Sequence, residues 1–202
     1  MTLPDISPLA SVAALALSLF TLWFTILRRG TVRSTHPSFI AVRYDFVGNK
    51  VPQAKIFLRV LLFSTGKRGH VVETLFLRVR EGDRKAEFSF WGHGDKELIR
   101  GSGLFVPDTG VAANHHFNPL DAESLFMFSG GVYLLELVAK LVGSKQLVSL
   151  WSIELEMPTK AYAASIAKDT AVFYSWSPEQ KRYVASIESR TGAVHAFSDP
   201  GS

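Results

Sequence analysis

Uncharged and mostly apolar residues run without interruption from Ile6 to Leu27, where Arg28 ends the run. A helix that crosses the hydrocarbon core of a bilayer needs about 20 such residues. A buried helix of a soluble domain would show alternating polarity around its circumference, and this run does not. The pattern therefore predicts a transmembrane helix over residues 8–29.

A secretory signal peptide is the main alternative for this segment. Such a peptide begins with a basic stretch, has a shorter apolar core and ends at a small-residue cleavage site. Here the chain begins Met1-Thr-Leu-Pro-Asp5 without Lys or Arg, and the apolar run ends in arginine. We therefore expect an uncleaved span.

The charges beside the span predict its orientation. Lys and Arg near the ends of a span favour the cytoplasmic side. Arg28, Arg29 and Arg33 all follow the span, and none precedes it. We expect an extracytoplasmic N-terminus at residues 1–7 and a cytoplasmic C-terminal domain at a cell inner membrane, with the bilayer as a partner. The three arginines also suit contact with anionic lipid.

One side of the expected helix carries small and hydroxyl side chains. At about 100° per residue, five of them fall on one stripe: Ser11, Ala14, Ser18, Thr21 and Thr25. Small residues let two helices approach closely, so the stripe is a candidate face for homo-oligomerisation. The alternative is that such residues are merely tolerated in a short span.

Beyond a juxtamembrane linker at residues 30–38, apolar and polar residues alternate with period 2, as in half-buried strands. The alternation predicts strands near residues 40–46, 56–62, 74–80, 87–90, 133–141 and 147–155. Short strands separated by regular turns are typical of an antiparallel β-sandwich, which we expect over residues 39–157. Its likeness to an immunoglobulin domain is an architectural analogy, because the chain has no cysteine.

The pattern changes in the C-terminal extension, residues 158–202. Residues 159–168 are rich in alanine and suit a short helix, and residues 171–187 read as a hairpin. The sequence leaves open whether this hairpin joins the sandwich or forms a separate flap.

The amino-acid composition and the absence of known motifs exclude several classes of function. The 202 residues fit one domain plus the anchor, and the net charge of +4 is too small and dispersed to indicate nucleic acid. Without cysteine, disulfides, thiolate catalysis and Cys-ligated zinc are excluded. The glycine-rich stretches match neither a phosphate loop nor a nucleophile elbow. We expect no catalytic residue and no cofactor.

A long irregular region at residues 92–118, with one short strand at 104–106, carries the strongest chemical cluster. Its possible nitrogen and oxygen ligands for a metal ion are His93, His115, His116, Asp95 and Asp108. Their spacing matches no zinc pattern, and histidines that order a long loop are the alternative.

Four aromatic residues lie on strand faces that otherwise carry charge: Phe57, Phe63, Phe76 and Trp91. Grouped and exposed aromatics mark interaction surfaces. The alternative, which we favour, is that the aromatic-rich C-terminal hairpin covers them.

The strings Trp91-Gly-His-Gly, Gly101-Ser-Gly-Leu-Phe-Val and Asn114-His-His-Phe follow a span that ends Leu27-Arg-Arg-Gly30. With these strings behind such a span, the chain resembles a group of uncharacterised, small, single-span bacterial membrane proteins. The resemblance implies a bacterial source and an inner-membrane location, and no activity. We thus expect a non-enzymatic binding or assembly module with an unidentified protein partner; the alternative is a metal-dependent enzyme or metal-binding protein.

Overall fold

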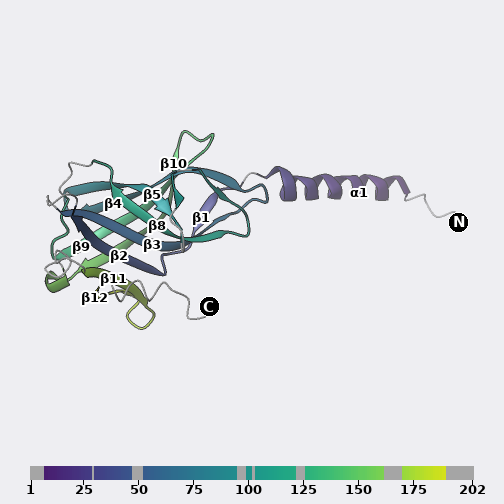
Figure 1. Ribbon diagram of the computed structural model, residues 1–202. Coiled ribbons are helices and arrows are strands. Elements are labelled where there is room, and N and C mark those ends of the chain that lie inside the picture. Colours follow the sequence, from purple (N-terminus) through teal and green to yellow (C-terminus); the bar gives the residue numbers. More distant parts are fainter. Residues whose placement is uncertain are drawn as a thin grey trace, which may run out of the picture.

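In the computed structural model, one apolar helix projects from a β domain (Figure 1). The structure describes residues 7–28, 30–46, 52–94, 99–101, 103–121, 126–161 and 170–189. The first strand follows the helix closely in the sequence, so the β domain sits directly at the C-terminal end of the helix.

The helix consists of α1 (Ser7–Leu22) and one π-helical turn, η1 (Trp23–Leu27). The Arg28 N–H donates to the carbonyl oxygen of Trp23, five residues back, at 2.8 Å. The segment Pro8–Leu27 has a mean hydropathy of 2.0, and none of its most apolar window is buried. Within the described ranges this one helix is long and apolar enough to cross a membrane, a test that a signal sequence also passes.

Twelve strands form one antiparallel sheet, in the order β10-β9-β4-β5-β8-β3-β2-β11-β12. Three short strands lie off this path: β1 pairs with β3, β6 with β5 and β7 with β4. The strands are β1 (Val32–Ser34), β2 (Phe39–Phe46), β3 (Pro52–Ser64), β4 (His70–Glu81), β5 (Arg84–His93), β6 (Ile99–Arg100), β7 (Leu104–Val106), β8 (Val111–Pro119), β9 (Gly131–Leu141), β10 (Leu147–Met157), β11 (Thr170–Ser177) and β12 (Arg182–Ser189).

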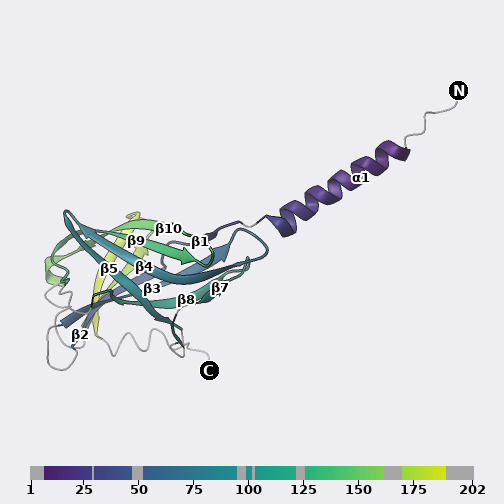
Figure 2. The same ribbon diagram turned by 90° about the horizontal axis from the view of Figure 1, so that it is seen from above.

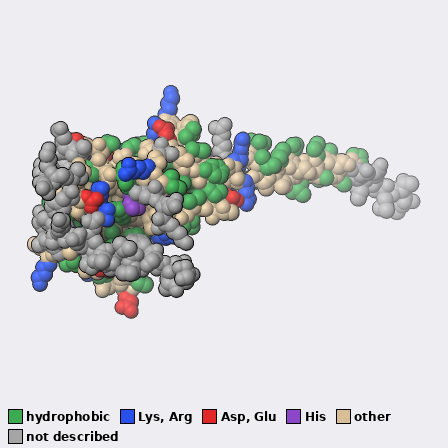
Figure 3. Space-filling model, viewed as in Figure 1, with side chains coloured by type: hydrophobic (Ala, Val, Ile, Leu, Met, Phe, Trp, Pro, Cys, Tyr) green, Lys and Arg blue, Asp and Glu red, His purple; other side chains and the backbone are tan. Residues whose placement is uncertain are grey.

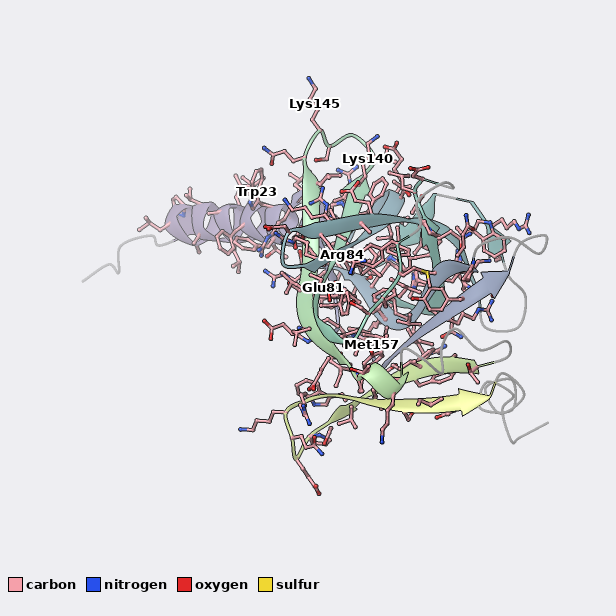
Figure 4. The ribbon with its side chains drawn as sticks, turned by 90° about the vertical axis from the view of Figure 1, so that its left-hand side faces the viewer. Trp23, Glu81, Arg84, Lys140, Lys145 and Met157 are labelled. Atoms are coloured by element: carbon pink, nitrogen blue, oxygen red, sulfur yellow. The ribbon has the colours of Figure 1, made fainter. Side chains whose placement is uncertain are left out.

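The sheet curls around one core, so that its two end strands come together (Figure 2). Arg182 of β12 pairs with Glu156 of β10, with 2.7 Å between Nη1 and Oε2. Beside this pair, the Tyr174 hydroxyl contacts Met157 Sδ at 3.3 Å, where β10 ends against β11 and β12 (Figure 4). These contacts tie the C-terminal hairpin to the far edge of the sheet.

The core follows from the period-2 alternation of the strands. On β3 every second side chain is buried, including Ile56, Leu58 and Val60, whereas Lys55 and Arg59 on the opposite face are half-buried. At the end of the sheet remote from the helix, Phe126 and Phe128 are buried, and both rings pack against the ring of Tyr133. These two side chains close that end of the core.

The prediction of a mainly antiparallel β domain behind one apolar helix is confirmed. The β-sandwich and the immunoglobulin-like arrangement are not confirmed, because the described strands belong to one curled sheet. Alternation along a strand shows which face of the strand is buried. A single curled sheet and two stacked sheets both bury one face of each strand, so the alternation does not distinguish these two architectures.

Two segments predicted as irregular contain strands. The expected linker at residues 30–38 holds β1, and the expected loop region at 92–118 holds the nine-residue β8 besides the strand at 104–106. On β8 the buried positions include His115 between Ala113 and Phe117. A polar residue at a core position interrupts the apolar alternation, and this hid the strand.

The C-terminal hairpin joins the sheet, because β11 pairs with β2. It therefore lies in the sheet and not across its outer face, and the expectation that it covers Phe57, Phe63, Phe76 and Trp91 was wrong. Tyr174 and Tyr183 of the hairpin face the core. The helix expected over residues 159–168 lies largely outside the described residues.

Candidate functional site: an aromatic and basic surface on β2, β3, β5 and β8

A bulge in β5 sorts the neighbouring aromatic and histidine side chains onto two faces. In the pairing of β5 with β8, Phe90 lies opposite Phe117 and Gly92 opposite His116, so Trp91 is the extra residue. The ring of Phe90 then contacts His93 and His115, whereas the ring of Trp91 lies near His116. The bulge thus turns His93 to the face of Phe90, whereas Trp91 lies on the outer face, as alternation with Phe90 places it.

On the outer face, rings and cations from several strands meet. We call the following six residues the aromatic–basic surface: Arg43 of β2, Lys55 and Phe57 of β3, Trp91 of β5, Arg100 of β6 and His116 of β8. Figure 3 shows one histidine side chain near basic and acidic side chains on the face of the domain that is turned to the viewer.

Ring contacts connect the strands across this surface. The His116 ring meets Phe57 edge to face at 4.6 Å between centroids, and it lies 6.5 Å from Trp91. Arg43 Cζ stands 4.3 Å from the Phe57 centroid, and Arg100 Cζ stands 4.4 Å from that of Trp91. Because a guanidinium that stacks on a ring can still donate from its N–H edge, an arginine in this arrangement combines ring packing with hydrogen-bond donation.

The surface is basic. Of its three cations, Arg43 and Lys55 lie next to one carboxylate, that of Asp45, which lies 3.3 Å from Arg43 Nε and 2.8 Å from Lys55 Nζ. Burial, together with the charges of Arg43 and Lys55, lowers the pKa of His116 to about 4. His116 is therefore neutral at pH 7, and its ring offers one donor and one acceptor.

The other two histidines lie on the opposite face of the same strands. The rings of His93 and His115 are stacked at 6.4 Å between centroids, and Phe90 contacts both. His115 is fully buried, and its Nδ1 lies 2.9 Å from the carbonyl oxygen of Ala113. Since neighbouring residues of a strand point to opposite faces, His116 cannot join this pair.

The five candidate metal ligands are therefore not brought together by the part of the chain that the structure describes. No three His, Asp or Glu side chains within it lie close enough to hold a metal ion. Asp108 instead accepts from Lys67 Nζ at 2.6 Å, a contact that lowers the pKa of Asp108 and raises that of Lys67. Asp95 lies outside the described residues.

The hydroxyls on the small-residue stripe of the helix bond to their own backbone. Ser18, Thr21 and Thr25 each donate to the carbonyl oxygen four residues earlier, at 2.7–2.9 Å. Ser11 and Ala14 are exposed on the same helix. These internal bonds satisfy the donors, so the stripe offers small size more than hydrogen bonds to a second helix.

Of the three juxtamembrane arginines, two are described. Arg28 is exposed, with its Cζ 6.0 Å from the ring centroid of Phe24, and Arg33 is exposed on β1. Arg29 lies outside the described residues. In Figure 3, basic side chains stand where the helix meets the β domain.

Comparison of the chain with known proteins identifies no related protein. No protein-family model matches the chain, and neither a curated protein nor a solved structure matches it. The resemblance to small single-span bacterial membrane proteins stays a prediction.

Sequence analysis identified Phe57 and Trp91 as outward aromatics but missed the cations that stack on them. Arg43 lies 14 residues before Phe57 in the sequence, and Arg100 lies 9 residues after Trp91. The pairing of β2 with β3 and of β6 with β5 brings them together. Cross-strand neighbours depend on register, which a single sequence leaves open.

Proposed function

We propose that the chain is a single-pass inner-membrane protein whose cytoplasmic β domain binds an acidic segment of a partner protein through the aromatic–basic surface. The observation that carries this proposal is the outer-face group of stacked rings and cations, with one carboxylate among its described neighbours.

The length and environment of the helix support the membrane span. The 20 residues Pro8–Leu27 measure about 30 Å at 1.5 Å per residue, the thickness of a bilayer core. Exposed large side chains surround this helix, including Leu17, Phe20 and Trp23. In water they would form an extended apolar surface, whereas lipid covers them at no cost. The arginines after the span support a cytoplasmic domain.

The chemistry of the surface supports an acidic partner. Tyr, Trp, Phe and Arg are enriched in protein interfaces, and arginine next to an aromatic ring is a common centre of binding energy. Guanidinium groups bind carboxylates through paired hydrogen bonds. Trp91 and Arg100 supply both features at one place on the outer face.

Photocrosslinking of the full chain in bacterial cells tests this binding role. A benzoyl-phenylalanine at position 89 is expected to form a discrete protein adduct, because Ser89 lies two residues before Trp91 on the same face of β5 and leaves all six residues of the surface in place. Adding Arg100→Glu is expected to weaken the adduct about tenfold, the effect of losing one charge-assisted hydrogen bond. Arg100→Lys keeps the charge and is expected to retain most of the adduct.

The same crosslinker at Leu120, which is 57% exposed, serves as the control position. The proposal fails if position 89 gives no more adduct than position 120. It also fails if the adduct at position 89 is unchanged by Arg100→Glu.

We further propose that the helix self-associates through Ser11, Ala14, Ser18, Thr21 and Thr25. The exposed small side chains of this stripe support close approach of a second helix, as in other membrane helix pairs. The alternative of a metal-dependent enzyme has less support, because His116 faces away from His93 and His115.

A further inference from the structure

The loop between β3 and β4 is fastened to the residues that leave the helix. The Thr31 N–H donates to Thr65 Oγ1 at 2.8 Å, and the Thr65 N–H donates to the Thr31 carbonyl at 2.9 Å. Gly30 has a φ of +65° and lies so close that an added Cβ would stand 2.5 Å from Gly66 N. Helix exit and loop therefore form one unit.

This attachment limits how far the loop lies from the membrane. Thr31 follows Leu27 by four residues, which span at most about 14 Å when fully extended. The headgroup layer on each side of a bilayer core is about 5–8 Å thick. If Leu27 ends the span, the loop at residues 65–69 must lie in or next to this layer.

Exposed apolar side chains stand at this same end of the sheet. Phe105 of β7 is 55% exposed, and it lies opposite Val71 of β4, which is 40% exposed. Val142 is 61% exposed, and its N–H donates to the Val71 carbonyl at 3.0 Å. The Phe105 ring also rests on the loop, because a Cβ added to Gly69 would meet it at 2.6 Å.

Basic side chains accompany these apolar ones. Lys67 and Arg68 are exposed in the loop, and Arg28 and Arg33 are exposed beside it. Lys145 projects from the hairpin that follows Val142 (Figure 4). Aromatic and aliphatic side chains flanked by Lys and Arg are typical of protein surfaces that lie in the headgroup layer of a membrane.

We propose that this end of the β domain is a second membrane contact, in which Phe105, Val71 and Val142 enter the lipid surface and Arg68 meets anionic headgroups. This inference rests on the proposed span, since the helix brings the loop to the bilayer. Two contacts in place of one fix the tilt of the domain relative to the membrane. The aromatic–basic surface then keeps a constant direction towards its partner.

Lipid quenching in the full chain tests this contact. Because the native chain contains no cysteine, Phe105→Cys creates one labelling site for an environment-sensitive fluorophore. In liposomes of phosphatidylcholine and phosphatidylglycerol with brominated acyl chains, we expect clear quenching of this label. Leu120→Cys, which replaces a side chain of matching exposure at the C-terminal end of β8, is expected to show none.

A second labelling site, at Val142, tests the contact in a chain that still carries Phe105. Val142→Cys is expected to be quenched as well, and adding Arg68→Glu is expected to reduce this quenching in anionic liposomes but not in pure phosphatidylcholine. If the chain floats with liposomes but positions 105 and 142 are quenched no more than 120, the second contact is wrong and the span stands. If the chain does not float with liposomes, the span is wrong and the contact falls with it.

Discussion

The double substitution Leu17→Arg/Leu19→Arg is expected to move the full chain from the membrane fraction into the soluble fraction. Both residues lie near the middle of Pro8–Leu27, and neither is buried by protein. An arginine at the centre of a spanning helix costs about 2.5–3.5 kcal/mol on insertion scales, so two of them cost about 5–7 kcal/mol. No described residue of the β domain contributes a carboxylate to this part of the helix to offset the cost.

Alkaline extraction of membranes measures this effect. The unmodified chain and the control Leu17→Ile/Leu19→Ile are expected to stay in the pellet, because isoleucine is as apolar as leucine. A double-arginine chain that resists extraction as well as the control would contradict a simple span. An intact mass that lacks residues 1–28 in the unmodified protein would show a cleaved signal sequence instead.

The substitution Phe128→Ala is expected to lower the free energy of unfolding of the β domain by about 3–5 kcal/mol. Phe128 is 2% exposed, and its ring lies 5.0 Å from Tyr133 and 5.2 Å from Phe126 between centroids. Removing the ring leaves a cavity where the end of the core is closed. A loss of this size is a large share of the about 5–15 kcal/mol that stabilises a typical domain.

Urea unfolding of the full chain in detergent micelles, followed by tryptophan fluorescence, measures this difference. Phe105→Ala is the matched control, since Phe105 is 55% exposed, and we expect it to cost about 1 kcal/mol or less. Equal losses in the two variants would mean that Phe128 does not close the core.

The sequence was most informative where a physical pattern is local. An apolar run of 20 residues needs no tertiary context to indicate a helix that is long and apolar enough to cross a membrane, and Leu27 is the last helical residue in the structure. Period-2 alternation likewise placed β9 and β10 within two residues of their observed bounds, whereas it found only the middle of β3. In both cases neighbouring residues carry the whole signal.

The sequence was least informative where partners are distant. The closure of the sheet depends on contacts such as that of Tyr183, whose hydroxyl donates to the Pro37 carbonyl at 2.7 Å across 146 residues. The three-residue strand β1 is too short for a period to show. The aromatic–basic surface needs the pairing of β2 with β3 and of β6 with β5, and neither pairing can be read from spacing alone.

Cysteine labelling of the full chain in spheroplasts tests most directly the central claim, a spanning helix with a cytoplasmic binding domain. The cysteine-free chain allows single sites at Thr2 and at Glu179, which is exposed between β11 and β12. With a membrane-impermeant maleimide, Thr2→Cys is expected to react in intact spheroplasts, and Glu179→Cys only after the membrane is permeabilised. Reaction of Glu179→Cys in intact spheroplasts would place the β domain outside the cytoplasm and contradict the account.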